Sequence, residues 1–374
     1  MKRIQSIDFA RGLVMIIMAL DHVRDLIHTS SVTQSPTDLS TTTPILFFTR
    51  WITYLCAPTF VFLSGTSAYL SFKRKNNYSE SRKFLLKRGC WLIILEFSIV
   101  NFGLFFDPGF HTMLFEVIAA IGFGFIILSL LLRIPAKTTG IIGLLIIFCH
   151  ELLNVTPLFT PGAFSFLSNR VFVMAYPPIP WLGIMLIGYA SGKLFELPVK
   201  ERQKIFFRSG AIALLLFVTI RLANVYGDPL TWSYQKNTVF TFLSFINLSK
   251  YPPSLLFCMI TLGILFLTLA FAEKFKNPLL DIAIIYGKAP LFYFVLHFYI
   301  IHLIMICTMF LQGFHWSDLD FASGNFGRPK GISSGLSLGP IYIIWIAVVA
   351  LLYKPCRWFG RYKSVHAKWW LKYI

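Results

Sequence analysis

Long apolar segments recur through the whole chain. No other feature of the sequence restricts its possible folds as strongly. Each segment is close to the roughly 20 residues that an α-helix needs to cross the hydrocarbon core of a bilayer. With 56% hydrophobic and only 13% charged residues, the chain is too apolar for a soluble globule. We therefore expect an all-α, polytopic integral membrane protein whose residues 1–374 form a single domain. Ten transmembrane helices are predicted, at residues 9–28, 47–72, 86–106, 113–132, 138–155, 178–195, 205–224, 252–272, 289–311 and 338–353.

Lysine and arginine are distributed unevenly among the connections between these segments. They are concentrated at 73–88 and at 193–208. They are scarce in the alternate connections, at residues 29–46, 107–112, 156–177, 225–251 and 312–337. Because cytoplasmic loops of membrane proteins carry an excess of Lys and Arg, this pattern predicts that both termini face the cytoplasm. The basic residues of the cytoplasmic loops then account for the net charge of +18, and we expect no nucleic-acid partner.

The end of the chain has the composition of a membrane-interface anchor. Residues 356–374 mix Arg and Lys with Trp358, Trp369, Trp370 and Tyr373, so we expect a cytoplasmic interfacial tail there. The six cysteines lie in or beside the apolar segments without metal-ligand spacing, and no metal site is predicted.

A cluster of ionisable residues lies at the far end of the first apolar segment. It consists of Asp21, His22, Arg24, Asp25 and His28. All except His22 recur at positions i, i+3, i+4 and i+7, which places them on one face of a helix. A charge at membrane depth is costly and marks a functional site by default. We therefore expect these side chains to line a shared cavity.

Other ionisable residues lie within the predicted helices. His297, in the ninth segment, is expected to partner the cluster from a second helix, and Arg221 lies near the outer end of the seventh. A single buried His or Glu often serves only to bond one helix to another. We therefore give Glu96, Glu116 and His302 a structural interpretation.

The cluster has the groups that acid–base chemistry requires. A neutral imidazole oriented by a carboxylate is a general base near neutral pH, and also a nucleophile toward an activated acyl group. We expect His28 or His22 to serve in this way, with Asp21 or Asp25 orienting the ring. Arg24 would balance the carboxylates or bind an anion. The sequence lacks the G-x-S-x-G, H-E-x-x-H and Walker A motifs of serine hydrolases, zincins and ATPases.

Several motifs along the chain resemble those of one family. Residues 6–13 read SIDFARGL, residues 21–25 read DHVRD, residues 49–53 read TRWIT, residues 250–256 read KYPPSLL and residues 356–361 read CRWFGR. In these motifs the chain resembles the bacterial DUF1624 proteins, which are related to the catalytic domain of heparan-alpha-glucosaminide N-acetyltransferase. The resemblance extends over nearly the whole chain.

The resemblance implies transmembrane acyl transfer. Acetyl-CoA would be the cytoplasmic acyl donor, and a sugar or glycan on the opposite face would be the acceptor. The resemblance also implies a catalytic His shortly after the first helix, a position nearest to His28, with His22 in place of a family Asn. For the acyl-CoA we expect contacts from Arg11, Arg24, Arg50 and Lys250.

Several features of this interpretation stay open. They are the acceptor's identity, N- against O-acylation, direct transfer against an acyl-histidine intermediate, and oligomeric state, with a homodimer as one arrangement. The expected location is the bacterial inner membrane, in contact with its lipids.

A second class of function fits the same residues. In a proton-coupled transporter, or another membrane protein that binds small molecules, the same Asp, Arg and His side chains would form a proton or anion site. Broken helices at Pro58, Pro178 and Pro253 would suit such a protein. The lack of a clear inverted repeat favours the enzyme.

Overall fold

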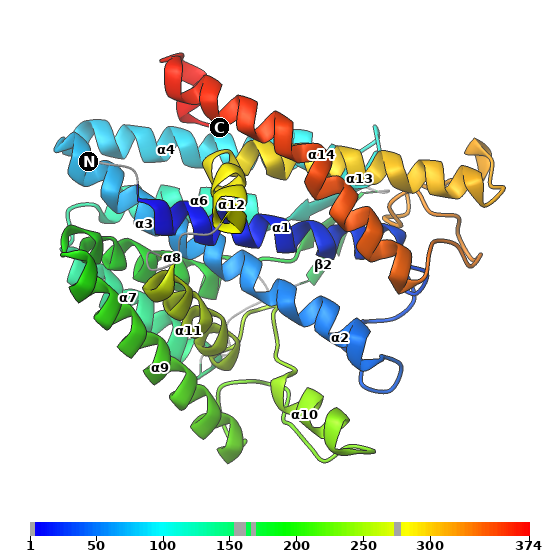
Figure 1. Cartoon of the computed structure of the whole chain (residues 1–374), viewed down its shortest axis with the longest axis horizontal. Coiled ribbons are helices and arrows are strands. Elements are labelled where there is room, and N and C mark those ends of the chain that lie inside the picture. Colours follow the sequence, from blue (N-terminus) through cyan, green and yellow to red (C-terminus); the bar gives the residue numbers. More distant parts are fainter. Residues whose placement is uncertain (1–3, 153–161, 166–169, 273–277) are drawn as a thin grey trace.

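Helix α1 (Gln5–Ile27) runs through the middle of the molecule, and other helices pack around it (Figure 1). The computed structural model describes residues 4–152, 162–165, 170–272 and 278–374. Most of α1 is buried, because other helices pack against it. It contacts α3 (Cys56–Lys75), α12 (Pro278–Lys288), α13 (Pro290–Leu311) and α14 (Leu338–Val365). The ionisable cluster therefore lies on a helix that other helices surround.

The remaining helices complete the bundle. They are α2 (Pro44–Trp51), α4 (Tyr78–Leu95), α5 (Asn101–Phe105), α6 (Val117–Leu131), α7 (Ala136–Cys149), α8 (Pro178–Ser191), α9 (Val199–Ala223), α10 (Thr238–Ile246) and α11 (Leu255–Phe271). A 3₁₀ turn, η1 (Ile52–Leu55), joins α2 to α3, and a π-helical turn, η2 (Glu96–Val100), joins α4 to α5. Helices α2 and α3 therefore form one long, locally irregular segment, and α4 and α5 form another.

Helices occupy each of the ten predicted positions, with shifted ends. Within the described residues, five segments are long and apolar enough to cross a membrane: Pro44–Lys75, Tyr78–Phe105, Val199–Ala223, Pro290–Leu311 and Leu338–Val365. Helices α6 and α11 are apolar but shorter. The membrane character is thus supported, while the count of ten spans and the orientation of the termini stay predictions. Residues 153–155 of the fifth predicted segment lie outside the described residues.

Two predicted boundaries differ clearly from the structure. The fourth predicted segment begins as a strand, and its helix starts only at Val117. Helix α14 continues beyond residue 353 to Val365 with Pro355 inside it, so the predicted tail begins within a helix. Proline removes only one intrahelical hydrogen bond, and the packing of α14 against α1, α12 and α13 extends the helix past that defect.

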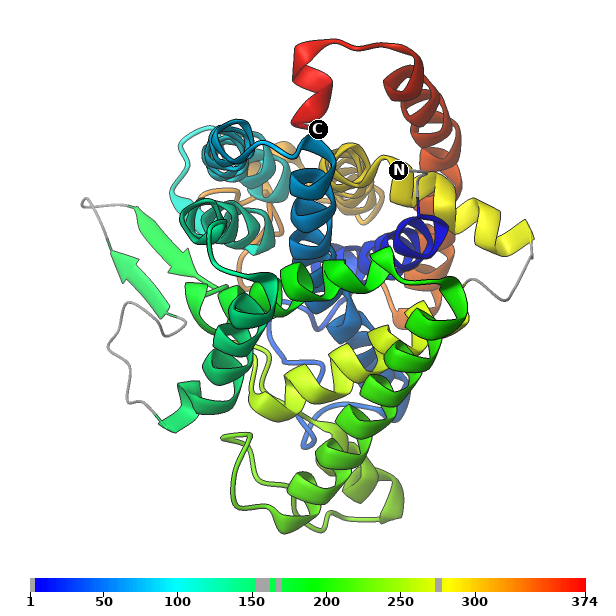
Figure 2. The same ribbon diagram turned by 90° about the vertical axis from the view of Figure 1, so that its left-hand side faces the viewer.

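A small sheet on the flank of the bundle was not anticipated by the all-α prediction. It contains β1 (Thr112–Phe115), β2 (Gly162–Ser165) and β3 (Val171–Met174) in the order β1-β3-β2, with β1 and β3 parallel (Figure 2). Strands of four residues are too short to show a periodicity in sequence. The parallel pair places the residues that follow β1 and β3 at the same edge of the sheet.

Helix α1 packs unusually close to α12 because glycines lie at their crossing. A Cβ atom on Gly12 would lie 1.7 Å from the carbonyl oxygen of Ala283, and one on Gly287 would lie 1.8 Å from that of Asp8. Small residues at helix crossings are typical of membrane proteins, where close packing drives helix association. Both glycines are therefore required by this crossing.

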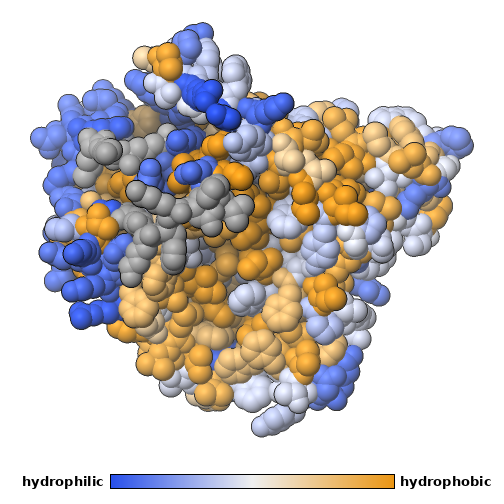
Figure 3. All heavy atoms as spheres, in the orientation of Figure 1, coloured by the Kyte–Doolittle hydropathy of each residue, from blue (hydrophilic) through white to orange (hydrophobic). Residues whose placement is uncertain are grey.

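The outer helices present apolar side chains to their surroundings. In the most apolar stretches of α9 and α14, only 22% and 17% of the residues are buried. Figure 3 shows hydrophobic residues across the middle of the molecule and hydrophilic residues gathered at its left end, where α3 ends and α4 begins. An apolar middle beside a charged end is the surface expected of a protein embedded in lipid.

Candidate functional site

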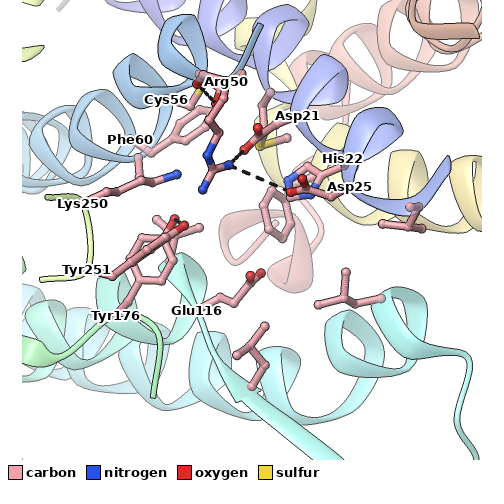
Figure 4. Close-up of a pocket in the computed structure, with 18 of the residues that line it drawn as sticks. Asp21, His22, Asp25, Arg50, Cys56, Phe60, Glu116, Tyr176, Lys250 and Tyr251 are labelled. Carbon is pink, nitrogen blue, oxygen red and sulfur yellow. Dashed lines mark hydrogen bonds and ion pairs between the residues drawn. The ribbon is translucent and has the colours of Figure 1, made fainter. Parts of the chain in front are cut away.

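A pocket lies where the end of α1 meets α2, the start of α6 and two outer connections (Figure 4). It encloses about 690 Å³, part of it open to solvent. We call it the Asp21 pocket. Its polar lining residues are Asp21, His22, Asp25, Arg50, Thr53, Cys56, Glu116, Tyr176, Lys250 and Tyr251. The structure thus brings part of the predicted cluster together with residues far away in sequence.

Four charged side chains form a network on one side of the pocket. A guanidinium nitrogen of Arg24 lies 2.6 Å from a carboxylate oxygen of Asp21 and 2.5 Å from one of Asp25. Arg50 approaches the same two carboxylates, at 2.5 Å from Asp21 and 3.9 Å from Asp25. The helical spacing explains the contact of Asp21 with Arg24, which lies one turn further along α1. The two arginines compensate both carboxylates, of which that of Asp21 is buried.

His22 lines the pocket next to this network and contacts His297 of α13. The centroids of the two imidazole rings are 5.0 Å apart. In His297 the Nδ1 atom lies 2.5 Å from the carbonyl oxygen of Phe294, so Nδ1 carries the hydrogen and Nε2 is left as an acceptor. This buried Nε2 has no hydrogen-bond partner among the described residues. The predicted pairing of His297 with the cluster is therefore present in the geometry.

His28 is not among the residues that line the pocket. Its ring is 3.0 Å from the hydroxyl of Ser30, and its carbonyl oxygen accepts a hydrogen bond of 2.7 Å from Arg328. Its backbone also pairs with Leu336. These contacts join the end of α1, which closes at Ile27, to the outer loops that carry Arg328 and Leu336.

The opposite wall carries Lys250, which is expected to contact the acyl-CoA, and three groups that the sequence did not single out as functional. Glu116, interpreted above as structural, precedes α6 and points its carboxylate into the pocket (Figure 4). The Nζ atom of Lys250 is 5.0 Å from the ring centroid of Tyr251, whose ring is 5.3 Å from that of Tyr176. Within the described residues, neither Glu116 nor Lys250 has an ion-pair partner within 4.0 Å. Both charges are therefore open to a ligand.

A repeated sequence signal could have indicated the two tyrosines. Tyr176 and Tyr251 each begin a Tyr-Pro-Pro motif in an outer connection. Proline fixes the backbone after each tyrosine and so helps to hold the ring in place. Glu116 offers no such signal, because only the sheet places it at the pocket.

A second pocket, which we call the Arg88 pocket, lies toward the start of α1. It encloses about 570 Å³, again partly open, and is lined by Arg11, Arg88 and mostly apolar side chains. The two pockets share three lining residues, Phe60, Val117 and Phe294. They therefore adjoin each other along α1, with these side chains between them.

The four residues expected to contact acyl-CoA divide between these places. Arg50 and Lys250 line the Asp21 pocket, and Arg11 lines the Arg88 pocket. Arg24 lines neither, because its guanidinium is buried against Asp21 and Asp25. No group of three or more His, Cys, Asp or Glu side chains in the described ranges is arranged to hold a metal ion.

The fold and site together define a helical membrane protein with a buried, charged pocket. The family model for the catalytic part of heparan-alpha-glucosaminide N-acetyltransferase matches residues 3–226, which include the cluster, Glu116 and Tyr176. The chain belongs to this family, which confirms the resemblance seen in its motifs and indicates a membrane acetyltransferase. No curated protein matches the chain in sequence.

Proposed function

We propose that this protein is a transmembrane acyltransferase that moves an acetyl group from cytoplasmic acetyl-CoA to a sugar-type acceptor on the opposite face. One observation carries the proposal. His22 lies in a pocket with carboxylates and unpaired charges, and this pocket adjoins a second one toward the start of α1. Family membership supports the same class of chemistry.

In this proposal His22 is the general base. The acceptor's amine or hydroxyl attacks the thioester carbonyl, a C–N or C–O bond forms, and the C–S bond breaks to release the CoA thiolate. His22 takes the proton that the acceptor loses, and that proton then neutralises the thiolate. The carboxylates of Asp21 and Asp25 would stabilise the charged imidazolium, and His297 would limit the movement of the ring.

The opposite wall of the pocket would bind the reacting groups. The ammonium of Lys250 is available to the carbonyl oxygen as negative charge develops on it. Glu116 would accept a hydrogen bond from the acceptor, and the rings of Tyr176 and Tyr251 would pack against a sugar. A few polar groups among aromatic side chains are typical of small-molecule sites.

The two adjoining pockets suit a long, extended donor. Arg11 and His22 are eleven residues apart on α1, which corresponds to about 16 Å at 1.5 Å per residue. The pantetheine arm of CoA would cover that distance, with its nucleotide end in the Arg88 pocket and its thioester beside His22. Phe60 and Phe294 would have to move aside or flank the arm.

A transfer assay tests the function. Purified protein in detergent is incubated with radiolabelled acetyl-CoA and a panel of amino sugars and neutral sugars. We expect label to appear on at least one sugar and to require the protein. Proton-driven uptake of the same sugars into liposomes, without any acyl donor and without transfer, would instead support a transporter.

A further inference from the structure

The end of the chain folds back onto α4, where it contacts Arg88, one of the residues that line the Arg88 pocket. After α14, the chain turns and forms a short helical turn at Trp369–Lys372 before it ends (Figure 2). The carbonyl oxygen of Lys372 accepts a hydrogen bond of 2.9 Å from Arg88. The ring of Tyr373 lies 5.9 Å from that of Phe84 on α4, and Leu371 is only 3% exposed. These last residues, 369–374, are called the terminal turn below.

Arg88 has far more hydrogen-bonding capacity than this contact uses. A guanidinium has five N–H donors, and it binds phosphate or carboxylate best. Its buried Nε atom has no hydrogen-bond partner in the described part of the chain, and no carboxylate there lies within 4.0 Å of Arg88. Instead, Arg88 lies 5.9 Å from the ring centroids of Phe84 and of Phe125. Among the described residues, this partly buried cation has no counter-ion.

A second guanidinium lines the same pocket. Arg11 donates a hydrogen bond of 2.9 Å to Ser67 and lies 3.8 Å from a carboxylate oxygen of Asp8. Two arginines that face one apolar pocket repel each other, and an anion between them relieves that repulsion. The pocket therefore has the charge of a phosphate site.

We propose that the Arg88 pocket is the anion site that receives the phosphate groups at the nucleotide end of the acyl donor, and that the terminal turn is a displaceable cover on the guanidinium of Arg88. This inference rests on the transferase function proposed above. The carbonyl oxygen of Lys372 occupies the place of a phosphate oxygen on Arg88. A phosphate that takes up the Arg88 nitrogen now bonded to Lys372 displaces this carbonyl oxygen. Binding of the donor at that nitrogen therefore competes with docking of the terminal turn, and the turn weakens the apparent affinity of the donor.

The terminal turn is held by separate local contacts, as a displaceable cover requires. They include the bond from Arg88, the burial of Leu371, the ring contacts of Tyr373 with Phe84 and of Trp370 with Tyr362, and a hydrogen bond from Lys363 to Ile374. A bound phosphate would replace the contact to Arg88 with a stronger, charge-assisted hydrogen bond. The competition therefore favours the donor once its concentration is high enough.

The first test measures binding of CoA and of pantetheine to the full-length protein in detergent by calorimetry. Arg88→Met should weaken CoA binding at least tenfold and change pantetheine binding less than twofold. The matched control is Arg82→Met, an exposed arginine of the same helix, which should leave both unchanged. Two results would overturn the proposed phosphate site. One is an equal CoA affinity for Arg88→Met and Arg82→Met. The other is an equal loss of affinity for CoA and for pantetheine in Arg88→Met.

The second test releases the terminal turn. Leu371→Ser should undock it and raise CoA affinity at least threefold, whereas Trp369→Ser, whose side chain is 75% exposed, should have no effect. An unchanged or lower affinity in Leu371→Ser would overturn the cover. If CoA binds to the wild type but Arg88→Met has no effect, only this inference fails. If CoA binds to neither the wild type nor any variant, the transferase function fails with it.

Discussion

His22 is the residue on which the proposed chemistry depends most. It is the histidine of the first helix that lines the Asp21 pocket, while His28 is held by Ser30 and by the loop of Arg328. Replacing a general base typically costs about a hundredfold to ten-thousandfold in rate. We predict such a loss for His22→Gln, with little change in the melting temperature, and most of the activity retained in His28→Gln.

Kinetics of acetyl transfer, with thermal unfolding of both variants as the folding control, check this prediction. The opposite ranking, with His22→Gln active and His28→Gln inactive, would transfer the role of the base to His28.

Asp21 and Asp25 have different structural importance although both contact Arg24. The Asp21 side chain is 9% exposed and bonds two arginines, while that of Asp25 is 37% exposed. Removing one partner of a buried ion network leaves uncompensated charge and costs about 3–5 kcal/mol, whereas exposed pairs contribute about 0–1 kcal/mol. Thermal unfolding in detergent should therefore show a large destabilisation for Asp21→Asn and a small one for Asp25→Asn. Equal melting temperatures for the two variants would refute this ranking.

The sequence predicted one side of the site well and the other poorly. Asp21, Arg24 and Asp25 are close on one helix, so spacing alone reveals their proximity. Glu116 and the two tyrosines come from the sheet edge and from outer connections, whose meeting depends on the tertiary fold. Arg88 lies among many basic residues of the same connection, and nothing local distinguishes it.

At the level of elements, the crossing of α1 and α12 fixes the start of the helix that carries the cluster. A side chain at Gly12 would collide with the backbone at Ala283. Overpacking of this kind typically costs about 1–3 kcal/mol. Gly12→Ala should therefore lower the melting temperature. Gly339→Ala, where an added Cβ would meet nothing within 4 Å, is the matched control and should not. An unchanged melting temperature in Gly12→Ala would show that the two helices are not held this closely.

Hydrophobic length predicted the long elements but not the short ones. Apolar runs of about 20 residues stand out in any sequence, and helices do lie at all ten positions. Helices α10 and α12, of nine and eleven residues, and strands of four residues are too short to be recognised in this way. The turns η1 and η2 also escape prediction, because only neighbouring helices impose such irregular backbone.

At the scale of the whole molecule, the distribution of basic residues predicts which ends of the helices face the cytoplasm. Ser40 and Ser79 are both exposed and lie at opposite ends of the α2–α3 segment. A membrane-impermeant maleimide added to intact cells should label Ser40→Cys, and should label Ser79→Cys only after permeabilisation. Labelling of the unsubstituted protein, measured in the same way, gives the contribution of the native cysteines. Labelling of Ser79→Cys alone in intact cells would invert the topology.

The central claim is that the acetyl group crosses the membrane between donor and acceptor. Proteoliposomes that hold a sugar acceptor inside, with labelled acetyl-CoA supplied only outside, test it most directly. Protein molecules inserted with their basic connections facing outward should acetylate the trapped sugar. The His22→Gln variant should not. Acetylation only when donor and acceptor share one compartment, or release of the unmodified sugar through the protein, would contradict the account.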